Sequence, residues 1–112
     1  MNFLSIRHSV ITIHLVEVSA GREGPLSETL LPYLTMTPHL VLDMKGILLT
    51  SSEIGEIVNL AQAYQNKWKE QFRQVALVNL SDHGKKVLEV VKLDKLIHPY
   101  SSLDEAYRAC IA

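Results

Sequence analysis

The sequence predicts a single α/β domain, spanning residues 1–112, with a mixed sheet of four to five strands and about four helices. Short apolar runs typical of strands alternate with segments whose apolar residues recur every third or fourth position, as they do on one face of a helix. Such alternating units imply inner strands that are mainly parallel and are covered by helices. The length of 112 residues fits one domain of this kind.

The composition is that of an ordinary globular protein. Apolar residues make up 47% of the chain, and 12 acidic side chains balance 11 basic ones to a net charge of -1. Without a strong positive field, we expect no nucleic-acid binding. No stretch approaches the ~18 apolar residues needed to span a bilayer, so we expect no direct membrane insertion. Arg7, His8 and His14 interrupt the N-terminal apolar run, so it predicts no signal peptide, and we expect a cytoplasmic protein.

The first part of the chain predicts a β-hairpin. Residues 3–7 and 10–18 alternate apolar and polar side chains, the period of a strand, and residues 8–9 form the polar break between them. On this pattern His14 faces solvent. A loop at residues 19–25 follows, rich in small and turn-forming residues.

A short helix and a buried strand come next. Pro25 is expected to open the helix, and Pro32, which lacks an amide proton, is expected to kink or shorten it. The leucines at helical spacing are Leu26, Leu30, Leu31 and Leu34. The apolar run at residues 39–44 then suits a buried strand.

The clearest amphipathic helix begins at Thr50 or Ser51. Thr50 and Glu53 match a capping box, in which side chains satisfy free backbone amides at a helix start. The apolar positions that define the helix are Ile54, Ile57, Val58, Ala61, Tyr64 and Trp68. We interpret Tyr64 and Trp68, on the same face, as core residues or as a lid at the sheet edge.

Two further strand–helix units complete the chain. Residues 74–80 predict a second buried strand, followed by a helix capped at 81–82. Residues 96–100 predict a short edge strand, because Pro99 lacks a backbone donor. Either serine at 101–102 could cap the terminal helix. The single cysteine, Cys110, is interpreted there as a small apolar residue.

Two of these segments resemble the anti-sigma factor antagonist (STAS) family. Residues 40–60, LVLDMKGILLTSSEIGEIVNL, are similar to its central signature: a strand ending in Asp, a glycine, an apolar stretch, then Asp-Ser-Ser-Gly-Leu-Gly opening a helix. Residues 75–109 are similar to the strand, basic helix and acidic terminal helix that follow in that family. The resemblance implies a STAS-like fold and function through binding another protein.

The resemblance also implies a partner switch. Members of the family bind an anti-sigma factor that is a serine kinase, are released when the serine after the signature Asp is phosphorylated, and are reset by a phosphatase. Ser51 takes the place of that serine, with Ser52 as the second candidate. The implied partner-binding surface consists of Thr50, Ser51, Ser52, Glu53 and Gly55.

Two departures from the signature leave alternatives open. Thr50 replaces the signature Asp, and Glu53 replaces the first glycine, adding a negative charge beside the candidate hydroxyl. A phosphate at a helix start would be stabilised by free amides yet disrupt a docked partner. Serines are also common there for capping alone. The alternatives are a non-phosphorylated STAS scaffold and a regulatory subunit of a lipid ABC transporter, which has the same fold.

An enzyme is not expected. There is no glycine-rich phosphate loop or nucleophile elbow, so we assign no catalytic residues and no cofactor. The five histidines lack the spacing of a metal site. Close packing is expected to explain Gly55 and Gly84 within helices. Four lysines are interpreted as a solvated helix face: Lys85, Lys86, Lys92 and Lys95.

Overall fold

A mixed five-stranded sheet forms the centre of the molecule. The computed structural model describes residues 4–7, 10–15, 30–47, 49–72, 74–91 and 96–111. The strands are β1 (Leu4–Arg7), β2 (Val10–His14), β3 (His39–Asp43), β4 (Val75–Val78) and β5 (Ile97–Pro99). They are ordered as in the chain, with β1 antiparallel to β2 and the other neighbours parallel. The predicted α/β class is therefore confirmed.

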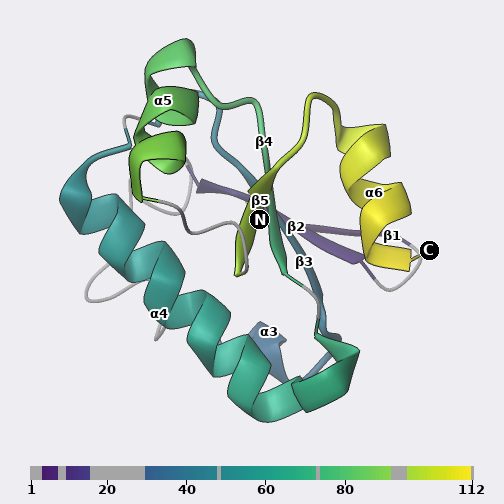
Figure 1. The fold of residues 1–112 in the computed structure, drawn as a ribbon. Coiled ribbons are helices and arrows are strands. Elements are labelled where there is room, and N and C mark those ends of the chain that lie inside the picture. Colours follow the sequence, from purple (N-terminus) through teal and green to yellow (C-terminus); the bar gives the residue numbers. More distant parts are fainter. Residues whose placement is uncertain are drawn as a thin grey trace.

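Helices cover both faces of this sheet. In the described ranges they are α3 (Leu31–Leu34), α4 (Ser51–Trp68), the 3-10 turn η1 (Lys69–Gln71), α5 (Asp82–Val91) and α6 (Leu103–Ile111). Because each parallel strand follows its neighbour in the same direction across the sheet, right-handed crossovers place α3, α4 and α5 on one face. The terminal helix α6 lies against the other face (Figure 1).

The N-terminal predictions are confirmed only in part. Arg7 pairs with Val10, as a hairpin turning at residues 8–9 requires. The strand predicted to reach residue 18 ends at His14 instead. Pro32 lies in the first turn of α3, where its missing amide has no helical partner to lose, and so does not kink the helix. The turn at 8–9, the loop at 19–25 and the helix start at Pro25 lie outside the described residues.

The two faces of the sheet bury separate apolar clusters, because side chains alternate along each strand. The first cluster, on the side of α4, includes Ile11, Ile13, Leu40, Leu42, Leu77, Ile57, Leu60 and Tyr64. The second cluster, under α6, consists of Val10, Val41, Ala76, Val78, Ala106 and Cys110. Trp68 packs against the first cluster. Tyr64, Trp68 and Cys110 are therefore packing residues, as predicted.

The two helical glycines differ. A Cβ at Gly84 would lie 3.0 Å from Leu80 Cδ2, so close packing explains that glycine. A Cβ at Gly55 would meet no described residue within 4 Å, and Gly55 is exposed. The packing explanation predicted for Gly55 is therefore wrong.

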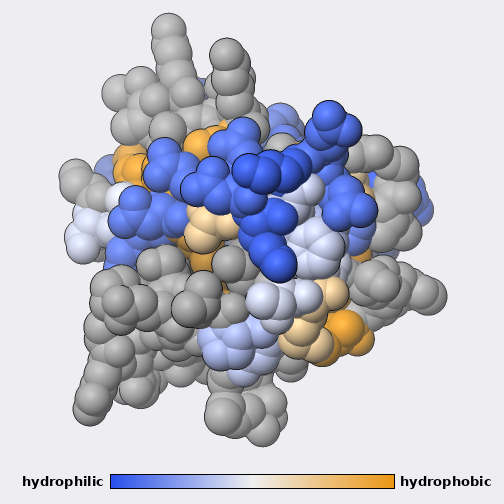
Figure 2. Space-filling model, turned by 90° about the horizontal axis from the view of Figure 1, so that it is seen from below, coloured by the Kyte–Doolittle hydropathy of each residue, from blue (hydrophilic) through white to orange (hydrophobic). Residues whose placement is uncertain are grey.

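The surface around the end of α4 is polar. Lys67, Lys69, Glu70 and Gln71 are exposed there. Seen from below, the described part of the surface is mainly hydrophilic, with small apolar areas between the hydrophilic ones (Figure 2). Among the described helices, none is both long and apolar enough to cross a membrane.

Tyr64 carries a buried hydroxyl inside the first cluster. Its side chain is 0% exposed, and its Oη has no hydrogen-bond partner among the described residues. Burial of the phenol raises the pKa of Tyr64 above its ordinary value. An unpaired buried hydroxyl costs roughly 1–3 kcal/mol, so this group works against the stability that the ring provides.

We expect Tyr64→Phe to leave the free energy of unfolding unchanged or to raise it by about 1 kcal/mol, because it removes only the unpaired hydroxyl. Urea denaturation measures this. As a control, Tyr64→Ala removes the whole ring, whose centroid lies 6.0 Å from that of the Phe72 ring. This change should lower the free energy of unfolding by about 3–5 kcal/mol. A Tyr64→Phe variant that is clearly less stable would mean that the hydroxyl is hydrogen-bonded in the folded protein.

Candidate functional site

The start of α4 is placed by the connection that leaves β3. A turn follows Met44, in which the Ile47 amide donates to the Met44 carbonyl at 3.0 Å. Gly46 has φ of 81°, in the left-handed region that glycine adopts readily. Leu49 is then buried, at 3% exposure, which anchors the chain in the core immediately before the helix begins.

Thr50 caps the helix, which confirms the Thr50 half of the predicted capping box. Its backbone is extended, with φ -94° and ψ 169°, and its Oγ1 accepts a hydrogen bond from the Glu53 amide at 3.2 Å. The first helical hydrogen bond runs from the Ile54 amide to the Thr50 carbonyl at 2.9 Å. Threonine therefore fills the capping role that the signature gives to aspartate.

The five predicted surface residues lie on the cap and the first turns of α4. Ser51 is the first residue of the helix and Ser52 the second, so their amides have no carbonyl partner within the helix. Thr50, Ser52 and Gly55 are exposed, and Glu53 is half-buried. The exposed face continues through further uncharged residues, Asn59 and Gln62. A partner could contact this stripe without disturbing the core.

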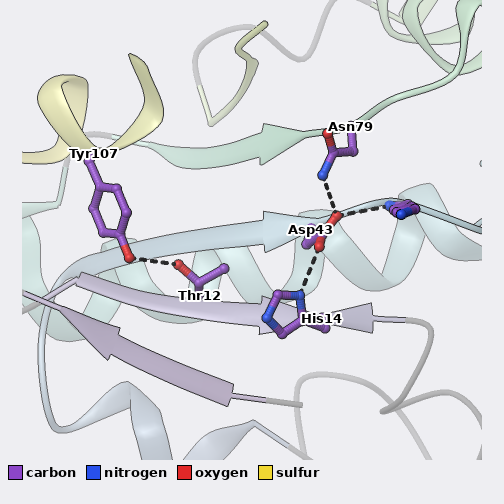
Figure 3. Close-up of polar contacts among 6 residues, drawn as sticks. Thr12, His14, Asp43, Asn79 and Tyr107 are labelled. Carbon is purple, nitrogen blue, oxygen red and sulfur yellow. Dashed lines mark hydrogen bonds and ion pairs between the residues drawn. The ribbon is translucent and has the colours of Figure 1, made fainter. Parts of the chain in front are cut away.

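A polar cluster around Asp43, which the sequence analysis did not predict, lies at the end of β3. His14 Nδ1 is 2.8 Å from Asp43 Oδ2, and Asn79 Nδ2 donates to Asp43 Oδ1 at 2.9 Å (Figure 3). The Lys45 amide also donates to Asp43 Oδ1, at 3.0 Å. We call the side chains of His14, Asp43 and Asn79 the Asp43 clamp. It joins the ends of β2 and β3 to the residue after β4.

The clamp keeps Asp43 ionised and places a proton on His14 Nδ1. Partial burial raises the pKa of Asp43, but the hydrogen bonds from Asn79, the Lys45 amide and His14, together with the charge of His14, outweigh burial and hold that pKa below its ordinary value. The ionised carboxylate can only accept hydrogen bonds, so His14 Nδ1 carries a proton. The prediction that His14 simply faces solvent is wrong: its side chain is 34% exposed and is bonded to Asp43.

A signal for this cluster was present in the sequence. His14 lies in the first predicted strand region and Asp43 near the end of the next parallel strand. Neighbouring parallel strands bring their carboxyl ends to one edge of a sheet. The register pairs His14 with Asp43 directly. What sequence reasoning lacked was the end of β2, which it placed at residue 18.

Other candidate sites can be placed only in part. Lys85 and Lys86 are exposed on α5, whereas Lys92 and Lys95 lie outside the described residues. No group of three or more His, Cys, Asp or Glu side chains in the described ranges is arranged to hold a metal ion. Cys110 is buried on the side of α6 that faces the sheet.

Solved structures are similar to nearly the whole chain. A crystal structure of TM1081, a candidate anti-sigma factor antagonist from Thermotoga maritima, has a TM-score of 0.74 and 16% identity, covering 97% of this chain and 93% of its own. An anti-sigma-factor antagonist (STAS) domain protein from Planctomyces limnophilus has a TM-score of 0.73 and 21% identity, covering 97% of both chains. The chain has the STAS fold.

A third solved structure shares this fold. The NMR structure of TM1081 has a TM-score of 0.67 and 17% identity, covering 98% of this chain and 88% of its own. No protein-family model and no curated protein sequence matches the chain. At these identities the likeness concerns the fold, and the STAS fold predicted from the signature is confirmed.

The lowered pKa of Asp43 predicts a specific acid sensitivity. Because the folded-state pKa lies below the unfolded value, the clamp stabilises the fold above the ordinary carboxyl pKa, and this contribution disappears as the pH falls through the folded-state pKa. We expect Asp43→Asn to be less stable than the wild type at pH 7 and to lose less stability between pH 7 and pH 3. Urea denaturation at several pH values measures both. Parallel curves for the two proteins would contradict this role of Asp43.

Proposed function

We propose that this protein is a regulator of the anti-sigma factor antagonist type, which acts in the cytoplasm by binding a protein partner and catalyses no reaction. The partner is a serine-kinase anti-sigma factor, which docks on the start of α4 and phosphorylates Ser51. Phosphorylation releases the partner, and a phosphatase restores the binding-competent form. The STAS fold, together with a serine pair at the signature position, carries this proposal.

The placement of the serines suits a switch that leaves the fold intact. A phosphate on Ser51 would lie at the N-terminal end of an 18-residue helix, where unpaired amides and the helix dipole favour negative charge. Glu53 is in the same turn and would oppose the second charge of the phosphate. A docked partner would meet a solvated dianion in its interface, so its affinity would fall while the domain stayed folded.

Gly55 gives independent support for a partner at this surface. Glycine within an exposed helix costs about 0.5–1 kcal/mol relative to alanine. Nothing among the described residues requires it, because none of them lies within 4 Å of where a Cβ at residue 55 would stand. A binding surface explains the glycine, since a bare backbone lets a second protein approach the helix more closely than any side chain would.

Phosphosite mapping tests the switch directly. We expect mass spectrometry of the protein from its native cells, stressed and unstressed, to find a phosphate on Ser51 whose occupancy changes with condition. Ser102 is the matched control, because it is an exposed serine that caps α6 by accepting from the Glu105 amide at 3.2 Å. It should carry none.

The other outcomes of this mapping are also informative. A regulated phosphate on Ser52 instead would assign the switch to the second candidate. Phosphate on neither serine, with the protein abundant, would contradict the switch and favour a non-phosphorylated scaffold or a regulatory subunit of a lipid ABC transporter. Co-purification then separates these two, because only the subunit would bring an ATPase with it.

Gly55→Ala should separate stability from binding. We expect the free energy of unfolding to rise by about 0.5–1 kcal/mol, because alanine is the better helix former, while affinity for the kinase recovered by co-purification falls. Calorimetry on the purified pair measures the affinity. Asn66→Ala, an exposed position about three turns further along near the far end of α4, also favours the helix but lies away from the helix start, so it should bind as the wild type does. Unchanged binding by Gly55→Ala would contradict a close approach at this residue.

A further inference from the structure

The Asp43 clamp lies next to the connection that carries the chain from β3 to the start of α4. One carboxylate receives hydrogen bonds from three separate segments: the end of β2, the residue after β4, and the first amide of the connection beyond Met44. Both oxygens of Asp43 are used, and its side chain is only 15% exposed. Because both oxygens of this carboxylate are hydrogen-bonded within the protein, we interpret it as a group that holds chain segments together and not as a ligand site.

The geometry points to His14 and Asn79 as positioning residues that hold the start of α4 in its partner-binding place by fixing Asp43. The chain turns out of the sheet at Asp43, and the bond from the Lys45 amide to Oδ1 sets the direction of that turn. The inference rests on the proposed function in one respect: it takes the start of α4 to be the surface that the partner contacts.

The backbone of Asn79 supports this role. Asn79 has φ of 60°, in the left-handed region where glycine is favoured and asparagine is among the few tolerated alternatives. A glycine would fit this backbone more easily, so the side chain must contribute something that glycine cannot. Its hydrogen bond to Asp43 Oδ1 at 2.9 Å is that contribution.

The connection between β3 and α4 is held at two points. The effect of the clamp on the position of this connection can therefore be measured apart from its effect on folding. At its start, the Met44 amide donates to the Val78 carbonyl at 2.9 Å and the clamp fixes Asp43 and Lys45. Nearer the helix, Leu49 is anchored by the core. Loss of the clamp should therefore loosen the stretch between these anchors while the sheet and α4 remain folded.

The test is amide hydrogen exchange followed by NMR on the full chain, under conditions where exchange reports opening. In Asn79→Gly, the backbone stays favourable and only the bond to Asp43 is lost. We expect the amides of Lys45 and Ile47 to exchange about fivefold faster, the factor that corresponds to one net hydrogen bond. The amides of Lys85 and Ala106, in the first turns of α5 and α6, should be unchanged.

Two sets of variants control this measurement. Lys69→Gly makes the same kind of change at another left-handed residue, φ 55°, and should leave Lys45 and Ile47 unaffected. His14→Asn keeps a donor near the position of Nδ1, whereas His14→Leu has a similar shape and none. Only His14→Leu should speed exchange at Lys45 and Ile47.

Either of two results would overturn the inference: unchanged exchange at Lys45 and Ile47 in both Asn79→Gly and His14→Leu, or faster exchange by the same factor at every amide. The second would make the clamp a contributor to global stability only. No partner takes part in this measurement, so its failure would leave the proposed function standing. A lack of phosphate on Ser51 would likewise leave the clamp standing.

Discussion

The parallel pairing of β2, β3 and β4 is the constraint on which the rest of the molecule depends. It brings the last residues of these strands to one edge, with His14 beside Asp43 and Asp43 beside Val78. Polar side chains are placed there because the strands themselves are buried on both faces. The same edge is where the chain leaves β3 to begin α4, so strand pairing and helix placement are coupled through one carboxylate.

Burial divides α4 lengthwise into two faces, one packed on the sheet and one exposed. Ile57, Leu60 and Tyr64 face the first cluster and fix the helix to the sheet. The opposite stripe, from Ser52 through Gly55 and onward, is exposed and uncharged. A helix held so firmly on one side can present backbone and short side chains to a partner on the other with little further loss of conformational entropy on binding.

The fold could be predicted from the sequence because its elements carry strong local signals. The apolar periodicity of α4 and the capping pair at Thr50 and Glu53 define that helix without reference to the rest of the chain. The end of β2 could not be found this way, because Val16 and Val18 continue the alternating pattern beyond the point where the strand pairs with β3. Strand pairing depends on residues far apart in the sequence, so the local alternation of apolar and polar side chains does not show where it ends.

The candidate site could likewise be predicted only where its residues are close together in the sequence. Thr50, Ser52, Glu53 and Gly55 were found from one continuous segment, and the structure places them on the start of one helix. The clamp was not predicted because His14 and Asn79 are far from Asp43 in sequence and come together only through the order of the strands in the sheet. Gly55 was assigned to packing because a sequence cannot show that the space beside a glycine is open.

The second cluster has a consequence for how the protein is made. It joins Val10 in β2 to Ala106 and Cys110 in the last helix, and Thr12 Oγ1 lies 3.5 Å from the Tyr107 hydroxyl, 95 residues further along. On a ribosome, the strands and crossover helices emerge first, since domains fold from the N-terminal side as they are synthesised. The apolar face of the sheet under α6 therefore stays uncovered until the residues of α6 have left the ribosome. Over that interval the uncovered apolar face can contact other chains, which is the kind of transient exposure that favours aggregation.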